Sequence, residues 1–200
     1  PMLVISNGIN LEQFTPGKAP ASLYKKFAIP QKVPIVTYIG RVDAEKHIHV
    51  LLKAFAAVLK KVPTSHLVIV GHGTEFEAMK ELADELSIAD SVTFTGRVSD
   101  EDLILLYRIG DLYAIPSPAE LQSIATLEAM ASGQPIVAVD AGALGELCHN
   151  NKNGYLFGLD DDSAMAKSII KILTDTKKRT TFSKESMRIA GTHDLIHTLE

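Results

Sequence analysis

The feature that most constrains this chain is a repeated alternation between short apolar runs and longer stretches with helical spacing. The runs 34–40 and 65–71 are continuously apolar and end in glycine, which is typical of strands buried on both faces of a parallel sheet. Further strands are predicted at 92–95, 111–115, 136–139 and 154–157, and helices at about 51–59, 75–86, 99–107, 124–132, 143–149, 161–174 and 177–190. The alternation predicts an α/β fold: a Rossmann-like, doubly wound parallel sheet of about six strands with helices on both faces.

Size and charge narrow the class of protein. The 200 residues fit a single domain, 1–200, and the formal net charge is −4 with no block of Lys and Arg, which argues against nucleic acid as a partner. The single cysteine, Cys148, forms no internal disulfide and is expected as a small core residue, so we expect a reducing, cytoplasmic location. The longest apolar runs are far shorter than the roughly 20 residues that span a bilayer, and no signal peptide is recognisable.

The two ends of the sequence look cut. Residues 3–6 are predicted to form a strand with no helix before it, and residues 195–200 to begin a helical stretch that has no cap. We therefore expect that the sequence is part of a longer protein.

Two predicted strands end in the same three residues, Gly-Arg-Val. Gly40 and Arg41 follow one strand, and Gly96 and Arg97 follow another. Open α/β sheets bind ligands at the carboxyl edge, where a glycine lets the ligand approach the backbone and an arginine offers a fork of donors to an anion.

Arg41 and Lys46 flank a loop between a strand and the following helix. Two cations beside a helix N-terminus suit a diphosphate, because the helix amides add to their field. The alternative is a solvated turn in which Glu45 and Lys46 form a surface pair, and the spacing alone favours neither.

Glu120 and Glu128 lie eight residues apart around a predicted helix start. A carboxylate is a natural acceptor for the vicinal hydroxyls of a sugar or a ribose, and the backbone amides of Ser123–Ala125 would face an anion. General acid/base work and an exposed helix surface remain alternatives for the two carboxylates.

Two further patterns carry less weight. The sequence Gly71-His72-Gly73 follows a strand, but it lacks the third glycine and the downstream acid of a dinucleotide site, which argues against a dinucleotide-dependent oxidoreductase. No third metal ligand is evident for His47 and His49, so a partly exposed turn is preferred and no metal site is predicted.

Three segments in order resemble the group 1 (family 4) retaining glycosyltransferases: VISNGINLEQFTP at 4–16, YIGRVDAEK at 38–46 and ELQSIATLEAMASGQPIVA at 120–138. The resemblance covers essentially the whole chain and corresponds to the C-terminal, nucleotide-sugar-binding half of a GT-B enzyme. It implies that an N-terminal acceptor domain lies outside this chain and is its natural partner. Any peripheral membrane association would then be through that missing half.

The resemblance also implies roles for single residues. Arg41 and Lys46 would hold the donor diphosphate and stabilise its developing charge, Glu120 would lie against the sugar, and Glu128 would accept from the ribose. The base would meet the backbone after Arg97, near Val98, and the sugar and phosphates would meet the backbone at Gly40, Gln122, Ser123, Ile124 and Ala125. The implied donor is a UDP-, GDP- or ADP-sugar, a substrate rather than a cofactor, with no metal.

The sequence departs from the family pattern at two places. Leu121-Gln122-Ser123 replaces a common Gly-Phe-Gly, and His47 replaces a frequent glycine. We expect the domain alone to bind donor without efficient turnover. The alternatives are a nucleotide-sugar epimerase or phosphorylase of the same architecture, or a non-catalytic sugar-nucleotide-binding module.

Overall fold

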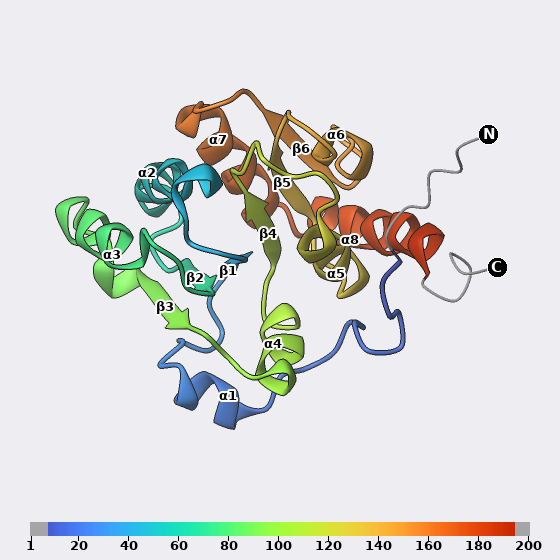
Figure 1. The fold of residues 1–200 in the computed structure, drawn as a ribbon, viewed down its shortest axis with the longest axis horizontal. Helices are drawn as coiled ribbons and strands as arrows, with labels where there is room; N and C mark the ends of the chain where they lie inside the picture. The colour runs from blue at the N-terminus through green and yellow to red at the C-terminus, as the bar shows by residue number, and fades with distance from the viewer. Residues whose placement is uncertain (1–7, 195–200) are drawn as a thin grey trace.

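A computed structural model describes residues 8–194 and contains one sheet of six parallel strands (Figure 1). The strand order is β3-β2-β1-β4-β5-β6, which is the order of the classic doubly wound fold. The strands are β1 (Ile35–Ile39), β2 (His66–Val70), β3 (Val92–Gly96), β4 (Leu112–Ile115), β5 (Ile136–Val139) and β6 (Gly154–Phe157). The predicted fold class is therefore confirmed.

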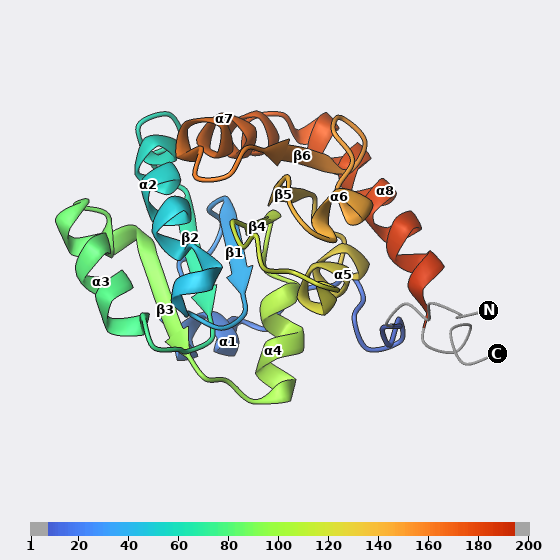
Figure 2. The ribbon, with the colours of Figure 1, turned by 45° about the horizontal axis from the view of Figure 1, so that its top comes forward.

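Helices cover both faces of the sheet. The α-helices are α1 (Ala21–Lys26), α2 (Ile48–Leu59), α3 (Phe76–Glu85), α4 (Asp100–Tyr107), α5 (Ile124–Ala131), α6 (Leu144–Leu147), α7 (Asp162–Leu173) and α8 (Thr176–Ala190). Short 3-10 segments are η1 (Ala44–Lys46), η2 (Ala89–Ser91) and η3 (Gly191–His193). Figure 2 shows α2, α3 and α7 on one face and α4 and α5 on the other. Within residues 8–194, no helix has the length and apolar character needed to cross a membrane.

Most helix boundaries follow the sequence signals. The Ser99 hydroxyl accepts from the Asp102 amide at 3.3 Å and caps α4, as predicted, and Gly133 ends α5 with a φ of 87°. The sequence analysis missed α1, a single short helix that begins after Pro20 and buries Leu23. The strand predicted at 3–6 and the helix predicted at 195–200 lie outside the described residues.

The core is the sheet with the apolar faces of its helices. Every residue of β1, β2, β4 and β5 is buried, which is why these strands read as continuous apolar runs. Cys148 is buried as expected, but it follows α6 instead of lying on a helix face, and burial raises the pKa of its thiol to about 12. Near the described ends, the Ile9 amide donates to the His193 carbonyl at 2.9 Å.

The fold contains a topological switch point between β1 and β4. The chain leaves β1 towards α2 on one face and leaves β4 towards α5 on the other (Figure 2). Open α/β sheets bind ligands at the carboxyl ends of strands at such a point. The loops 40–47 and 116–123 therefore lie at the same edge of the sheet.

A buried polar network links β1 to the ends of α4 and α5. The Thr37 hydroxyl donates to the Gln134 side-chain carbonyl at 2.6 Å, and the Gln134 amide donates to the Tyr107 carbonyl at 2.7 Å. All three residues are buried. The network fixes the end of α4 against the sheet.

We predict that Thr37→Val lowers the free energy of unfolding by about 1–3 kcal/mol, because the isosteric change leaves the buried Gln134 acceptor without its donor. Denaturant titration measures the difference. Thr180→Val, on the exposed face of α8, is the matched control and should stay within about 0.5 kcal/mol. A Thr37→Val protein as stable as the control would contradict the network's role.

Candidate functional site

The hydroxyls of two tyrosines donate hydrogen bonds to backbone carbonyls at the end of β1 and in the loop after it. The Tyr38 hydroxyl donates to the Arg41 carbonyl at 2.7 Å, and the Tyr113 hydroxyl donates to the Ile39 carbonyl at 3.0 Å. Burial raises the pKa of both phenols far above the ordinary value, so both hydroxyls stay protonated and keep donating. The backbone that carries Arg41 is thereby fixed at the sheet edge.

Lys46 and Glu120 form an ion pair across the switch point. Lys46 Nζ lies 2.7 Å from Glu120 Oε1, and the two side chains are only 14% and 15% exposed. Lys46 ends η1, directly before α2, and Glu120 lies in the loop between β4 and α5. The structure thus brings together two predicted site residues that are 74 positions apart.

Arg41 is neutralised by carboxylates of its own loop. Its guanidinium lies 2.6 Å from both Asp43 and Glu45, and its side chain is 66% exposed. The alternative in which Glu45 pairs with Lys46 is wrong, because Lys46 points to Glu120 and leaves Glu45 to Arg41. Hydrogen bonds from the Thr74 amide and hydroxyl, at 2.8 and 3.1 Å, hold the pKa of Asp43 below its usual value.

Steric contact with the loop after β1 requires glycine at both ends of the Gly71-His72-Gly73 sequence. A Cβ on Gly71 would lie 1.9 Å from the Gly40 carbonyl oxygen, and one on Gly73 would lie 2.3 Å from the Val42 carbonyl oxygen. The loops after β1 and β2 therefore touch through backbone, which only glycine permits. This contact explains the motif without a dinucleotide.

A hollow of about 470 Å³ opens at the carboxyl ends of β1, β2 and β3. It is lined by Ile39, Gly40, Arg41, Val70, Gly71, His72, Arg97, Val98 and Leu103. The two Gly-Arg strand ends therefore converge as the sequence indicated. Sequence reasoning missed His72, whose ring stacks on Phe76 at 4.6 Å and 19°; its position directly after a strand was the signal that could have identified it.

The start of α5 lies along the other side of the switch point. Its first residue, Ile124, donates its amide to the Gln122 carbonyl at 2.9 Å, and the buried Ser123 hydroxyl pairs with Thr126 at 2.7 Å. Both groups are thus already engaged within the turn. Leu121 in the same loop is 94% exposed. Gln122, Ser123, Ile124 and Ala125 are not among the residues that line the hollow.

Glu128 lies one turn further along α5 and is half-buried. The Tyr107 hydroxyl donates to Glu128 Oε2 at 2.7 Å, a partner that sequence reasoning did not anticipate. Burial raises the pKa of Glu128, and the Tyr107 hydrogen bond opposes that rise. The alternative of a solvated helix surface does not describe this carboxylate.

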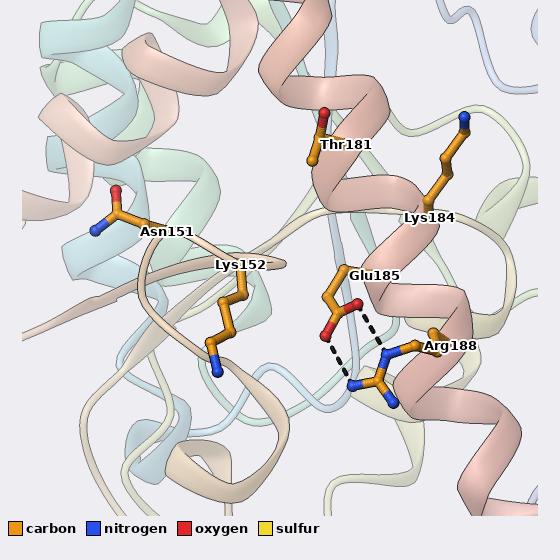
Figure 3. Close-up of a pocket in the computed structure, with 6 residues that line it drawn as sticks. All are labelled: Asn151, Lys152, Thr181, Lys184, Glu185 and Arg188. Atoms are coloured by element: carbon orange, nitrogen blue, oxygen red, sulfur yellow. Dashed lines mark hydrogen bonds and ion pairs between the residues drawn. The ribbon is translucent and has the colours of Figure 1, made fainter.

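Two clusters lie outside these residues. A hollow of about 590 Å³ between α8 and the turn before β6 is lined by basic and polar side chains, in which Arg188 forms a two-bonded ion pair with Glu185 (Figure 3). It contains none of the predicted site residues.

The expectation that His47 and His49 have no third metal-ligand group is wrong, because Asp160 lies beside them.

Comparison with known proteins agrees with this arrangement. Residues 22–188 match the model of the family described as glycosyl transferases group 1. The chain belongs to this family. It is 31% identical over 185 residues to a D-inositol 3-phosphate glycosyltransferase of Corynebacterium urealyticum, covering 88% of this chain and 44% of that protein. It is likewise 31% identical to an alpha-monoglucosyldiacylglycerol synthase of Streptococcus pneumoniae, with 94% and 44% covered.

Solved structures of other proteins have a similar fold. A sucrose-phosphate synthase from Thermosynechococcus elongatus is similar with a TM-score of 0.86 and 29% identity, covering 98% of this chain and 49% of that one. Anabaena HepE, in complex with UDP and glucose, is similar with a TM-score of 0.85 and 27% identity, covering 98% and 54%. The chain spans about half the length of these relatives and corresponds to one half of a GT-B fold.

We predict that Glu128→Gln makes this glycosyl transferase domain more stable at pH 8, because it removes a charge whose burial disfavours folding. The pKa of Glu128 is raised in the folded state, so the folded protein binds this proton more tightly than the unfolded chain, and folding is disfavoured above the raised pKa. The advantage of the variant should shrink as the pH falls through that pKa. Denaturant titrations from pH 8 to pH 5 measure it.

Glu185→Gln is the matched control with the opposite sign. Arg188 holds the pKa of Glu185 below its usual value, so the charged form of Glu185 favours folding at pH 8 and its loss should destabilise the protein slightly. Equal effects of the two variants at pH 8 would contradict the assignment.

Proposed function

We propose that this group 1 glycosyl transferase domain binds a nucleoside diphosphate sugar at the carboxyl edge of its sheet, as the donor half of a retaining hexosyltransferase. The observation that carries the proposal is the Lys46–Glu120 ion pair, which joins a cation of the loop after β1 to a carboxylate of the loop before α5. Arg41, in the same loop as Lys46, lines the hollow. The likeness to HepE, whose structure contains UDP and glucose, supports the same class of ligand.

The ion pairs of the ligand-free protein define how the donor enters. Lys46 is neutralised by Glu120, and Arg41 by Asp43 and Glu45. A diphosphate, which carries two negative charges in a nucleotide sugar, competes with these carboxylates for both cations. Once Lys46 turns to the diphosphate, Glu120 is released and can accept hydrogen bonds from the sugar hydroxyls, so one exchange engages both parts of the donor.

The nucleoside would extend from the diphosphate over the sheet edge. The hollow beside Arg41 offers the Arg97–Val98 backbone and the His72 ring to a base. Glu128, held by Tyr107, would accept from the ribose hydroxyls, and its raised pKa fits a carboxylate that awaits donors.

The same cations would support the chemistry. When the bond between the sugar and the diphosphate breaks, its electron pair goes to the leaving phosphate oxygen. Arg41 and Lys46 would stabilise that developing charge from fixed positions. We propose no metal for this step and expect the chain alone to bind donor without efficient turnover, because no acceptor site is assigned to it.

We predict that substitutions of Glu120 and Glu128 affect the binding of UDP and of UDP-glucose differently. Glu128→Ala should weaken UDP and UDP-glucose alike, by about 1.5–3 kcal/mol or roughly ten- to a hundred-fold in Kd, because both contain the ribose. Glu120→Ala should leave UDP binding intact or tighter, because Lys46 is freed, while the preference for UDP-glucose over UDP falls. Calorimetry with both ligands on both variants measures this, and ADP and GDP test the base.

The Glu120 variants need a folding control. Removal of one partner of this half-buried ion pair leaves the other without compensation and destabilises the fold. Glu120→Gln, which keeps the side-chain volume, is therefore measured beside Glu120→Ala, with thermal melting of each. Equal losses for both ligands in the folded Glu120 variants, or no loss in Glu128→Ala, would refute the assignment.

We predict that Glu45→Gln tightens UDP binding by a few-fold, because it removes one of the two carboxylates that compete with the diphosphate for Arg41. The gain is limited because an exposed ion pair contributes less than about 1 kcal/mol. Glu77→Gln removes a comparable exposed pair with Lys80 on α3 and should change nothing. Weaker UDP binding in Glu45→Gln would show that Arg41 does not face the diphosphate.

A further inference from the structure

Three side chains with metal-binding atoms meet between α2 and the loop after β6. They are His47, at the junction of η1 and α2; His49, in the first turn of α2; and Asp160, between β6 and α7. One ligand atom from each lies within 4.8 Å of the others. His47 Nδ1 is 2.8 Å from Asp160 Oδ1, and the two imidazole rings lie 5.4 Å apart between centroids.

The backbone reaches this contact through two unfavourable conformations. His47 has a φ of 50° and Asp160 a φ of 56°, both in the left-handed region that favours glycine. Asp and His adopt this region more often than most other residues do. The two positions are 113 apart in the sequence, yet their side chains face each other.

His49 completes the group with open ring nitrogens. It is half-buried, and its only close contact with another polar ring is the tilted approach of His47. Within residues 8–194, neither of its ring nitrogens has a hydrogen-bond partner. A half-buried imidazole aimed beside a second imidazole and a carboxylate has the donor atoms of a ligand set.

We propose that His47, His49 and Asp160 bind a divalent transition-metal ion, with zinc as the ion that fits best. Two imidazole nitrogens and one carboxylate oxygen suit zinc and its neighbours, whereas magnesium and calcium prefer oxygen alone. Ligand atoms around tetrahedral zinc lie roughly 3.3 Å apart, as bonds of about 2.1 Å require. The ion therefore needs the His47–Asp160 contact to open slightly and His49 to turn inwards.

A metal ion here acts as a clasp beside the donor site. It joins the start of α2 to the loop that enters α7, two helices that pack against each other (Figure 2). His47 directly follows Lys46, so the clasp restrains the end of the loop that carries the proposed diphosphate cations. None of the three ligands belongs to the proposed donor site.

The test is calorimetric titration of the 200-residue chain with ZnCl₂ and, separately, MgCl₂, without nucleotide. One zinc ion should bind per chain and magnesium should give no heat. His47→Gly, His49→Gln and Asp160→Asn should each weaken zinc binding at least about tenfold, since even outer-sphere partners of a metal change its affinity by 10–100-fold. His149→Gln removes a histidine outside the cluster and should bind zinc as the unchanged protein does.

The variants are chosen so that unfolding cannot imitate loss of a ligand. Glycine relieves the positive φ at position 47 and asparagine tolerates it at position 160, so both variants should melt no earlier than the unchanged protein when no metal is present. A visible Co²⁺ spectrum that the three variants lose supports the same ligands. The proposal is overturned if the unchanged protein binds no zinc, if zinc binding survives in all three variants, or if His149→Gln loses it equally. Because no nucleotide is used, the result is independent of the donor-site proposal.

Discussion

One half-buried ion pair, Lys46–Glu120, links the two loops at the switch point. Removing either partner would leave the other largely enclosed and without compensation. The pair therefore constrains both the start of α2 and the approach to α5. In the proposed exchange, a ligand that takes Lys46 frees Glu120 to accept from other donors, and the sugar hydroxyls of the donor would supply them.

The sheet supports the site through phenolic hydroxyls. Tyr38 and Tyr113 reach from buried strands to the carbonyls of the loop above, and Tyr107 reaches from the end of α4 to Glu128. Each hydroxyl is a neutral donor at any ordinary pH, so this support does not depend on ionisation. The carboxylate of Glu128, in contrast, is half-buried, and its burial disfavours the charged form.

Local patterns in the sequence predicted the frame of this protein, and contacts between distant loops decided the rest. Apolar runs located all six strands, and the helical spacing located α2 and α5, because periodicity depends only on near neighbours. The convergence of Arg41 and Arg97 followed from strand ends sharing an edge. Tyr107 beside Glu128, Asp160 beside His47, and the choice of Arg41 over Lys46 by Glu45 depend on side-chain direction, which no spacing rule supplies. The short helix α1 was not predicted, because its one buried residue, Leu23, gives no periodic apolar pattern.

The contact between Ile9 and His193 affects how the domain would respond to a force applied at its two ends. Residues at the two ends of the described range are hydrogen-bonded to each other, so these two ends lie at one place on the domain. A force applied through both ends is borne first by that short contact, and the six strands and the loops above them are outside its line.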